Sequence, residues 1–86
     1  MSGEEVTTIE MKDAVSRNLA LRHSADRLFD YIDSLKNTDV VLDFDAVHTA
    51  SRSFMHQFLR RLRNDNHNIH CINMSDNVKK MLDIVK

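Results

Sequence analysis

The stretch from Val40 to Arg63 (VVLDFDAVHTASRSFMHQFLRRLR) constrains the fold of this chain more than any other. It begins with a short, nearly all apolar run, Val40 to Phe44, and continues through a polar loop that holds two serines. An amphipathic segment follows from about Arg52 to Arg63. A short apolar run between polar turns favours a strand, and apolar residues at helical spacing predict a helix. The loop therefore lies where a parallel strand leads into a helix, the edge at which α/β sheets bind ligands.

Two further segments have the composition of strands. The β-branched segment Val6 to Met11 predicts a first strand at the edge of a sheet. Apolar and polar residues alternate from Ile69 to Met74, which predicts a third strand. The run Val40 to Phe44 has the pattern of a strand that is covered on both faces.

The segments between these strands are helical in pattern. One helix is expected to begin at Ser24, which can cap it, and to end at residues 37–39. A last helix is expected after Ser75 or Asp76, while residues 12–23 fit either a helical turn or a short strand. The large side chains on the apolar helix faces are expected in the core: Phe29, Phe54, Met55, Phe58, Met81 and Leu82.

The order of these elements, β-α-β-α-β-α, predicts a small α/β domain with a mainly parallel sheet and helices packed on it. With 86 residues the chain suits a single domain, residues 1–86, in which residues 1–5 are expected to be disordered. In this fold the loops at residues 45–53 and 73–77 lie at the same, carboxyl-end edge of the sheet. An exposed edge strand at Val6 to Met11 allows pairing between copies, so we expect a monomer or a weak dimer.

Composition narrows the classes of function. The net charge of −1 provides no strong field for nucleic acid or a membrane surface, and no segment is long and apolar enough to span a bilayer. Cys71 is the single cysteine, which rules out an internal disulfide framework and, with no signal-peptide pattern, indicates a cytoplasmic protein. Gly3 is the single glycine, so glycine-rich phosphate loops are excluded, and we expect no cofactor.

The two loop serines are the first candidates for a functional site. Ser51 and Ser53 stand where a helix begins, and a serine there usually caps the helix. A phosphate at the same place would meet free backbone N–H groups and the positive end of the helix dipole. Arg52 lies between the serines and can contact a phosphate or a partner, and His48 and His56 flank them.

Asp43 and Asp45 form a D-x-D pair after an apolar strand, which imitates the first motif of a magnesium-dependent phosphoryl-handling enzyme. That chemistry needs further acids and a lysine on later strands, and Asp76 with Lys79 and Lys80 are the downstream candidates for them. The alternative is that Asp43 ends the strand by accepting hydrogen bonds from loop amides.

Arg60, Arg61 and Arg63 are expected to point mostly outward, where they can contact the phosphates of a nucleic acid or form a solvated helix face. The charge balance and the lack of interleaved aromatic residues speak against the nucleic-acid interpretation.

The sequence His67-x-x-His70-Cys71 offers three metal ligands, but strand alternation puts His70 and Cys71 on opposite faces. No metal site is therefore predicted, and Cys71 is interpreted as a small buried residue.

The apolar strand, the acid at its end, the loop and the serine at a helix start together resemble a STAS-type domain, the fold of anti-sigma-factor antagonists. The chain is more closely similar to the prokaryotic STAS-like family of unknown function, over roughly Met11 to Leu62. The residues that carry this likeness are Arg22-x-Ser24-Ala25, Leu42–Phe44, Val47 and Ser51-x-Ser53-Phe54.

This resemblance implies a STAS-like fold and a non-catalytic protein-interaction module in regulation. It places Ser53 at the serine that the antagonists carry in phosphorylated form, although Phe54 stands here where they usually have a small residue. The implied partner is a protein, and the implied kinase has an ATP-binding fold like that of the anti-sigma kinases. The expected contact surface comprises Arg52, Ser53, His48 and His56, with Ser51 as a second phosphorylation candidate.

Overall fold

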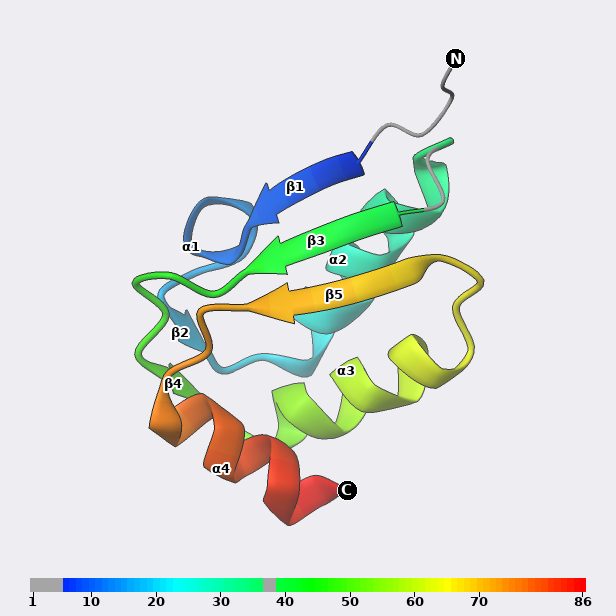
Figure 1. Ribbon diagram of the computed structural model, residues 1–86. Coiled ribbons are helices and arrows are strands. Elements are labelled where there is room, and N and C mark those ends of the chain that lie inside the picture. Colours follow the sequence, from blue (N-terminus) through cyan, green and yellow to red (C-terminus); the bar gives the residue numbers. More distant parts are fainter. Residues whose placement is uncertain (1–5, 37–38) are drawn as a thin grey trace.

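The computed structural model describes residues 6–36 and 39–86 (Figure 1). The expected disorder of residues 1–5 falls outside the described residues, as do Asn37 and Thr38 of the predicted helix end. The helix itself ends earlier than predicted, at Ser34, because Leu35 after it is extended, with φ −81° and ψ 143°. In chain order the elements are β1 (Val6–Glu10), α1 (Met11–Ala14), β2 (Asn18–Leu19), α2 (Arg22–Ser34), β3 (Asp39–Asp43), β4 (Thr49–Ala50), α3 (Arg52–Arg63), β5 (Asn68–Ile72) and α4 (Asp76–Val85). None of the helices in these residues combines the length and the apolar character that a membrane span requires.

β1, β3 and β5 form a parallel sheet with β3 at its centre. The register places Leu42 between Ile9 of β1 and Cys71 of β5. This arrangement confirms the predicted α/β class with a parallel sheet, and it confirms that the first strand lies at an edge. β5 ends at Ile72, two residues before the predicted end, because Asn73 has a φ of 57° and leaves the extended conformation.

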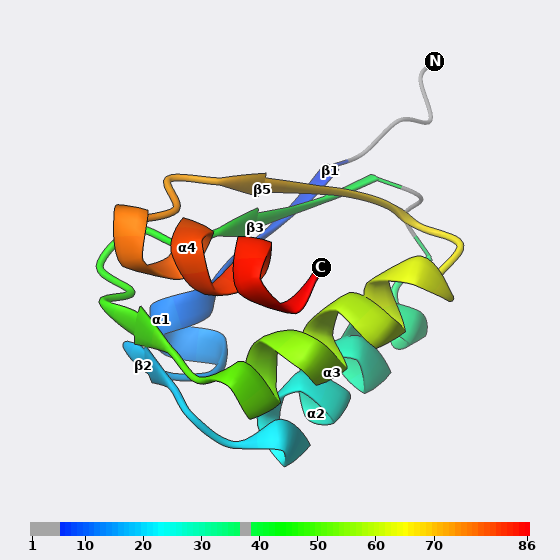
Figure 2. The same cartoon turned by 90° about the horizontal axis from the view of Figure 1, so that it is seen from below.

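The helices of the described residues all lie on one face of this sheet, as Figure 2 shows. Val40 and Leu42 point toward the helices and are fully buried, whereas Val41 lies on the other face and is half-buried. The prediction that this strand is covered on both faces was therefore wrong. The register neighbours of Val41 on the open face are Thr8 and His70, and both are exposed.

A second, very short sheet joins the two loops that precede α2 and α3. β2 and β4 pair in parallel, with Asn18 beside Thr49 and Leu19 beside Ala50. Residues 12–23, which fit either a helical turn or a short strand, contain both, because α1 and β2 follow one another there. β4 was not predicted. A strand of two residues is too short to show an alternating pattern in the sequence. β2 and β4 also pair with each other across about 30 positions of the chain, which the sequence does not indicate.

The helix starts agree only in part with prediction. α2 begins at Arg22, and its N-cap is Leu21 without a side-chain hydrogen bond, so the expected cap at Ser24 was wrong. Ser75 is the cap of α4, where the Val78 N–H donates to its Oγ at 3.3 Å. α3 begins at Arg52 and ends at Arg63, as predicted.

The core lies between the sheet and the helices, and Phe58 of α3 is at its centre. The ring of Phe58 lies 5.5 Å from that of Phe29, 6.2 Å from that of Phe44 and 6.0 Å from that of Phe54, measured between centroids. All four rings are buried, as is Met55. Met81 and Leu82 of α4 are partly buried and pack against this cluster. The expected core residues are therefore confirmed, with α4 at the periphery.

Candidate functional site

Ser51 has a structural role at the start of α3. Its Oγ accepts a hydrogen bond from the Phe54 N–H at 3.0 Å, which makes it the N-cap of the helix. The same hydroxyl donates to the Ala20 carbonyl at 2.8 Å, and the Ser51 N–H donates to the Leu19 carbonyl at 2.7 Å. The capping interpretation therefore holds for Ser51, which also joins α3 to the segment before α2.

Ser53 has a different environment although it stands only two positions later. It lies in the first turn of α3, is exposed, and has no hydrogen-bond partner for its side chain among the described residues. Near it is an open pocket of about 470 Å³ whose lining comes from α2, α3 and α4: Arg22, Arg52, Ser53, His56, Ile84 and Val85. Of the two candidate serines, Ser53 is the one whose hydroxyl is accessible to another protein.

The pocket is cationic. Arg22 and Arg52 are the first residues of α2 and α3, and neither helix has an acidic residue in its first turn. The helix dipole disfavours a cation at this end by a few tenths of a kcal/mol or more, so these arginines do not stabilise their own helices through the dipole. The arrangement therefore directs two helix N-termini and two guanidinium groups toward one region. A phosphate or carboxylate placed there would find positive charge and backbone N–H groups.

The structure brings together three of the four predicted partner-binding residues. Arg52, Ser53 and His56 line the same pocket, but His48 does not. His48 is exposed in the loop before β4, and its N–H donates to the Arg17 carbonyl at 2.8 Å. Arg22 was missed as a pocket residue, because the helix was expected to begin at Ser24 and the sequence did not show Arg22 as its first residue.

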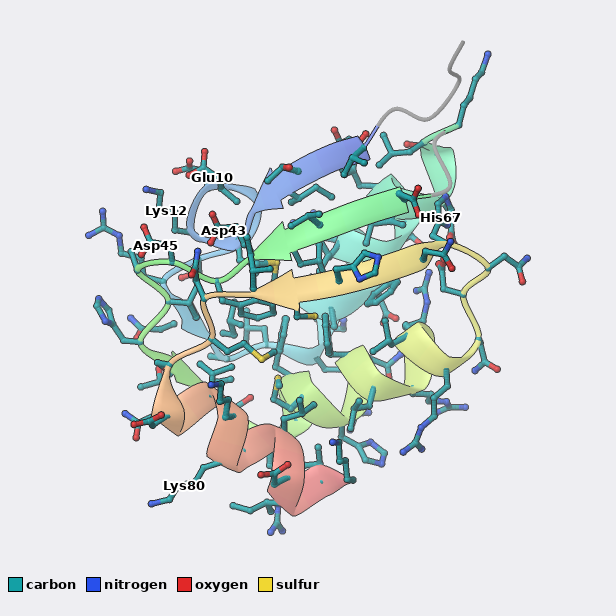
Figure 3. The ribbon with its side chains drawn as sticks, viewed as in Figure 1. Glu10, Lys12, Asp43, Asp45, His67 and Lys80 are labelled. Atoms are coloured by element: carbon teal, nitrogen blue, oxygen red, sulfur yellow. The ribbon has the colours of Figure 1, made fainter. Side chains whose placement is uncertain are left out.

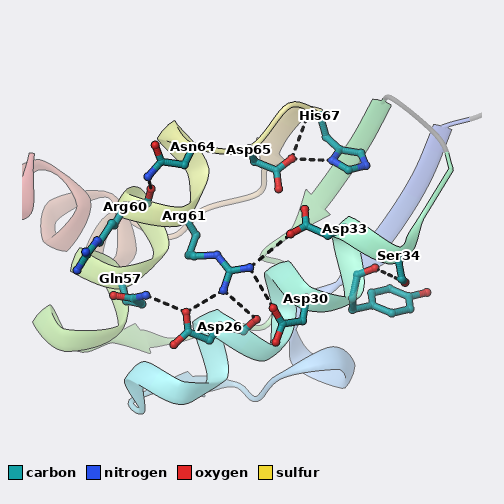
Figure 4. A network of polar contacts seen from close by, with 11 residues as sticks. Asp26, Asp30, Asp33, Ser34, Gln57, Arg60, Arg61, Asn64, Asp65 and His67 are labelled. Atoms are coloured by element: carbon teal, nitrogen blue, oxygen red, sulfur yellow. Dashed lines mark hydrogen bonds and ion pairs between the residues drawn. The ribbon is translucent and has the colours of Figure 1, made fainter.

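The three arginines at the end of α3 do not form one surface. Arg61 turns toward α2, where its guanidinium lies 2.9 Å from Asp26, 3.1 Å from Asp30 and 3.5 Å from Asp33 (Figure 4). The prediction that Arg61 points outward was wrong, because three carboxylates on α2 attract it. Arg60 and Arg63 line a second hollow elsewhere on α3. The three arginines therefore do not form the shared surface that a nucleic-acid interface built from all of them would need.

The contacts of Arg61 also change its electrostatics. The Gln57 amide donates to Asp26 at 2.8 Å, and this bond, together with the Arg61 guanidinium, lowers the pKa of Asp26. The hydrogen bonds to Asp26 and Asp30 raise the pKa of Arg61 further above its already high value. The Arg61 guanidinium also lies 5.6 Å from the centroid of the buried Phe29 ring. The ion-pair cluster is therefore in direct contact with the hydrophobic core.

A second polar cluster joins the end of α2 to the loop before β5. His67 Nδ1 lies 2.6 Å from Asp65 Oδ1 (Figure 4). Its Nε2 lies 3.4 Å from the Leu35 carbonyl. The hydrogen bond with Asp65 raises the pKa of His67. Desolvation opposes ionisation of Asp65, whose side chain is 4% exposed, but hydrogen bonds from Asp33 and His67 lower its pKa overall. The Asp33 pKa is raised, chiefly by its hydrogen bond with Asp65.

Asp33, Asp65 and His67 are also the residues best placed to hold a metal ion. Their possible ligand atoms lie within 4.8 Å of one another, and no other group of three such residues does so in the part of the chain that the structure describes. Both ring nitrogens of His67 face acceptors, and its raised pKa favours the protonated form, which cannot ligate a metal. Arg61 approaches Asp33 from the other side. Asp33 is therefore already paired with Arg61, and Asp65 with His67, instead of with a metal ion.

Asp43 and Asp45 lie at the carboxyl end of β3, near Glu10 and Lys12 (Figure 3). Asp43 Oδ1 accepts from the Asp45 N–H at 2.9 Å and from the Asn73 amide at 3.1 Å. These two bonds, with a contribution from Lys12, lower the pKa of Asp43. The loops after β3 and β5 therefore meet at one edge of the sheet, as predicted, and Asp43 has the loop-bonding role that was the alternative to phosphoryl chemistry.

Cys71 and His70 lie on β5, on opposite faces of the strand as the alternation predicted. Cys71 is exposed because β5 is an edge strand, so its interpretation as a buried residue was wrong. Neighbouring groups nevertheless desolvate its sulfur and raise the pKa of the thiol to about 11. The reactive thiolate form is therefore scarce at neutral pH.

Comparison with known proteins agrees with this architecture. The family model described as a STAS-like domain of unknown function matches residues 24–79, which is more than half of the chain. The match begins in α2, includes all of α3 with Ser53, and ends in the first turn of α4, so it extends further toward the carboxyl terminus than the resemblance predicted. No curated protein and no solved structure matches the chain. The strand order, the helix that follows the serine loop and this match together show that the chain belongs to the family of STAS-like domains of unknown function.

Proposed function

We propose that this domain is a non-catalytic regulatory module that binds a partner protein through the start of α3, and that phosphorylation of Ser53 controls the binding. The observation that carries the proposal is the contrast between the two serines. Both bonds of the Ser51 hydroxyl are internal, whereas the Ser53 hydroxyl is exposed in a cationic pocket. A kinase can reach Ser53 without disturbing the helix cap.

Electrostatics supports a switch at this position. A phosphate on Ser53 adds nearly two negative charges at a helix N-terminus, next to Arg22, Arg52 and His56. The domain itself tolerates that charge, because the helix dipole and the guanidinium groups stabilise it. The surface offered to a partner changes from cationic to neutral or anionic. Binding is therefore lost or gained without any catalysis by this chain.

The test is affinity capture of partners from lysate of the source cells with the wild type, Ser53→Ala, Ser53→Asp and Ser53→Asn. Ser53→Asn is the matched control, since it has nearly the size of aspartate without the charge. We expect the wild type, Ser53→Ala and Ser53→Asn to hold the same partner and Ser53→Asp to lose it. Equal capture by all four variants would reject the phosphorylation switch.

The modification itself is tested by intact-mass measurement after incubation with the co-purified kinase and ATP. One phosphate should be added to the wild type and to Ser51→Ala, but none to Ser53→Ala. Phosphate addition to Ser53→Ala would show that another residue is the acceptor. The kinase expected from the family resemblance has an ATP-binding fold like that of the anti-sigma kinases.

A further inference from the structure

The pocket beside Ser53 continues along α3. A second hollow of about 290 Å³ shares His56 and Val85 with the first, so the two form one groove between α3 and α4. We call this the α3–α4 groove and define it by its cationic and apolar side chains. The cationic side chains are Arg22, Arg52, His56, Arg60 and Arg63, and the apolar side chains are Leu59, Ile84 and Val85.

The positive charge follows a regular stripe. Arg52, His56, Arg60 and Arg63 stand at spacings of four, four and three residues, which puts them on one side of α3. From Arg52 to Arg63 the helix rises about 16 Å. Such a stripe suits an elongated ligand that lies along the helix rather than a single small ion.

No carboxylate neutralises this stripe. In the described part of the chain, none of the groove's arginines lies within 4.0 Å of a carboxylate, and no acidic residue lines either hollow. Arg61, one position from Arg60, has three such partners. Four arginines without a carboxylate partner among the described residues, Arg22, Arg52, Arg60 and Arg63, thus line the two hollows of one groove in a chain whose net charge is −1.

The apolar side chains of the groove indicate the kind of anion it accepts. Ile84 is 56% exposed on α4, and Leu59 and Val85 lie beside the arginines. An exposed isoleucine in a hollow provides a contact for an apolar side chain of a ligand. No described Phe, Tyr or Trp side chain lines the groove, so its stacking surface for the bases of a single-stranded nucleic acid is limited to His56 and the arginines.

We propose that the α3–α4 groove binds an acidic amphipathic helix of a partner protein. Carboxylates of that helix pair with the arginine stripe, while its apolar side chains pack on Leu59, Ile84 and Val85. The proposal rests on the proposed function, because it names the chemistry of the partner that the module recognises. A phosphate on Ser53 occupies one end of the groove and competes with the partner's carboxylates.

The test uses a defined probe, a fluorescein-labelled peptide of about 12 glutamate and leucine residues at helical spacing, the length of α3. Binding is measured by fluorescence anisotropy, and the site is mapped by backbone amide shifts of the labelled domain. We expect amide shifts confined to the start of α2 and to the residues of α3 and α4 that line the groove. Affinity should fall at least about tenfold in Arg60→Glu and in Arg60→Gln. Arg27→Glu, an exposed arginine of α2 outside the groove, is the control with the same charge change and should bind normally.

Other outcomes overturn the proposal. The inference fails if the peptide does not bind, if Arg60→Glu and Arg27→Glu lower its affinity equally, or if an oligonucleotide displaces it more effectively than unlabelled peptide. Circular dichroism confirms that each variant is folded. Ser53→Asp separates this inference from the proposed switch. A groove that still binds the peptide in Ser53→Asp keeps the inference and rejects the phosphorylation control.

Discussion

The two serines at the start of α3 differ in their contacts, because only Ser51 is hydrogen-bonded to another part of the fold. Ser51 caps α3 and bonds to Ala20, so its hydroxyl is part of the fold. Ser53 has no such bond and is exposed. The two positions therefore allow a direct comparison of a capping serine with an exposed serine at the start of one helix.

Replacing Ser51 with alanine should lower the free energy of unfolding by about 1 to 2 kcal/mol, because the helix loses its cap and the link to Ala20. Ser53→Ala is the control and should change it by less than about 0.5 kcal/mol. Urea unfolding followed by circular dichroism measures both variants. Equal effects of the two substitutions would contradict the roles assigned here.

His67 should make stability depend on pH. Its pKa in the folded chain is raised above the ordinary 6.5, so the imidazolium is favoured by folding. This contribution is fully present below pH 6.5 and is lost as the pH rises through the raised pKa. Replacing His67 with glutamine should remove about 1 kcal/mol of stability at pH 6, after discounting for solvent, and less at high pH.

The control for this pH dependence is His70→Gln, which changes an exposed histidine on the open face of the sheet. Unfolding in urea from pH 5 to pH 9 should give nearly parallel curves for the wild type and His70→Gln. Curves for the wild type and His67→Gln should converge toward pH 9. A constant difference over this range would show that His67 acts through packing rather than through its charge.

At the scale of elements, the contact between α2 and α3 has an apolar part and an ionic part. Phe29 and Phe58 pack across it, and Arg61 extends the contact outward to three carboxylates of α2. The ion pairs are partly exposed, yet a single guanidinium serves three acids, so its removal leaves like charges side by side.

Arg61→Ala should therefore lower the free energy of unfolding by about 1 to 2 kcal/mol, more than an isolated surface pair contributes. Arg63→Ala, which removes an arginine two positions later on the same helix, should change it by less than about 0.5 kcal/mol. High salt should narrow the difference between the wild type and Arg61→Ala in urea unfolding, because it screens the carboxylates left unpaired. The assignment fails if both alanine variants behave alike.

At the scale of the whole molecule, the charges are separated around α3. Carboxylates of α2 and Arg61 occupy one side of the helix, and the cationic groove lies on another. The sheet has one face free of the described helices and two edge strands. A monomer or a weak dimer therefore stays a prediction, and β1 and β5 are the places where a second copy can pair.

The stability of the whole domain should depend strongly on Phe58, whose ring contacts three others. Phe58→Ala should cost about 3 to 5 kcal/mol, a large share of what a small domain has available. Phe58→Leu keeps most of the volume and should cost less. Thermal unfolding should rank wild type, leucine and alanine in that order, and a folded Phe58→Ala domain of normal melting temperature would contradict this core.

Local patterns were sufficient for the main elements because the physics that forms them is local. The apolar run Val40 to Phe44 predicted a strand of a parallel sheet, and the stripe from Phe54 to Leu62 predicted α3 between Arg52 and Arg63. Ser51 and Ser53 were both candidate caps from their position before that stripe, and the structure makes Ser51 the cap. Where local signals were weak, at Ser24 and in residues 12–23, the boundaries were missed or left open.

By itself, the sequence determined the parallel α/β order, the core faces of the helices and the helix start at which Ser53 lies, because periodicity and caps act over a few residues. Only the tertiary structure decided which serine is accessible, which way Arg61 turns, and that Arg22, α3 and α4 enclose one groove. Each of these depends on residues about 30 positions apart or on separate helices, as in the bond from Ser51 to Ala20 and the ion pair from Arg61 to Asp30. Tertiary packing brings such residues together, and the periodicity of the sequence does not indicate which of them will be in contact.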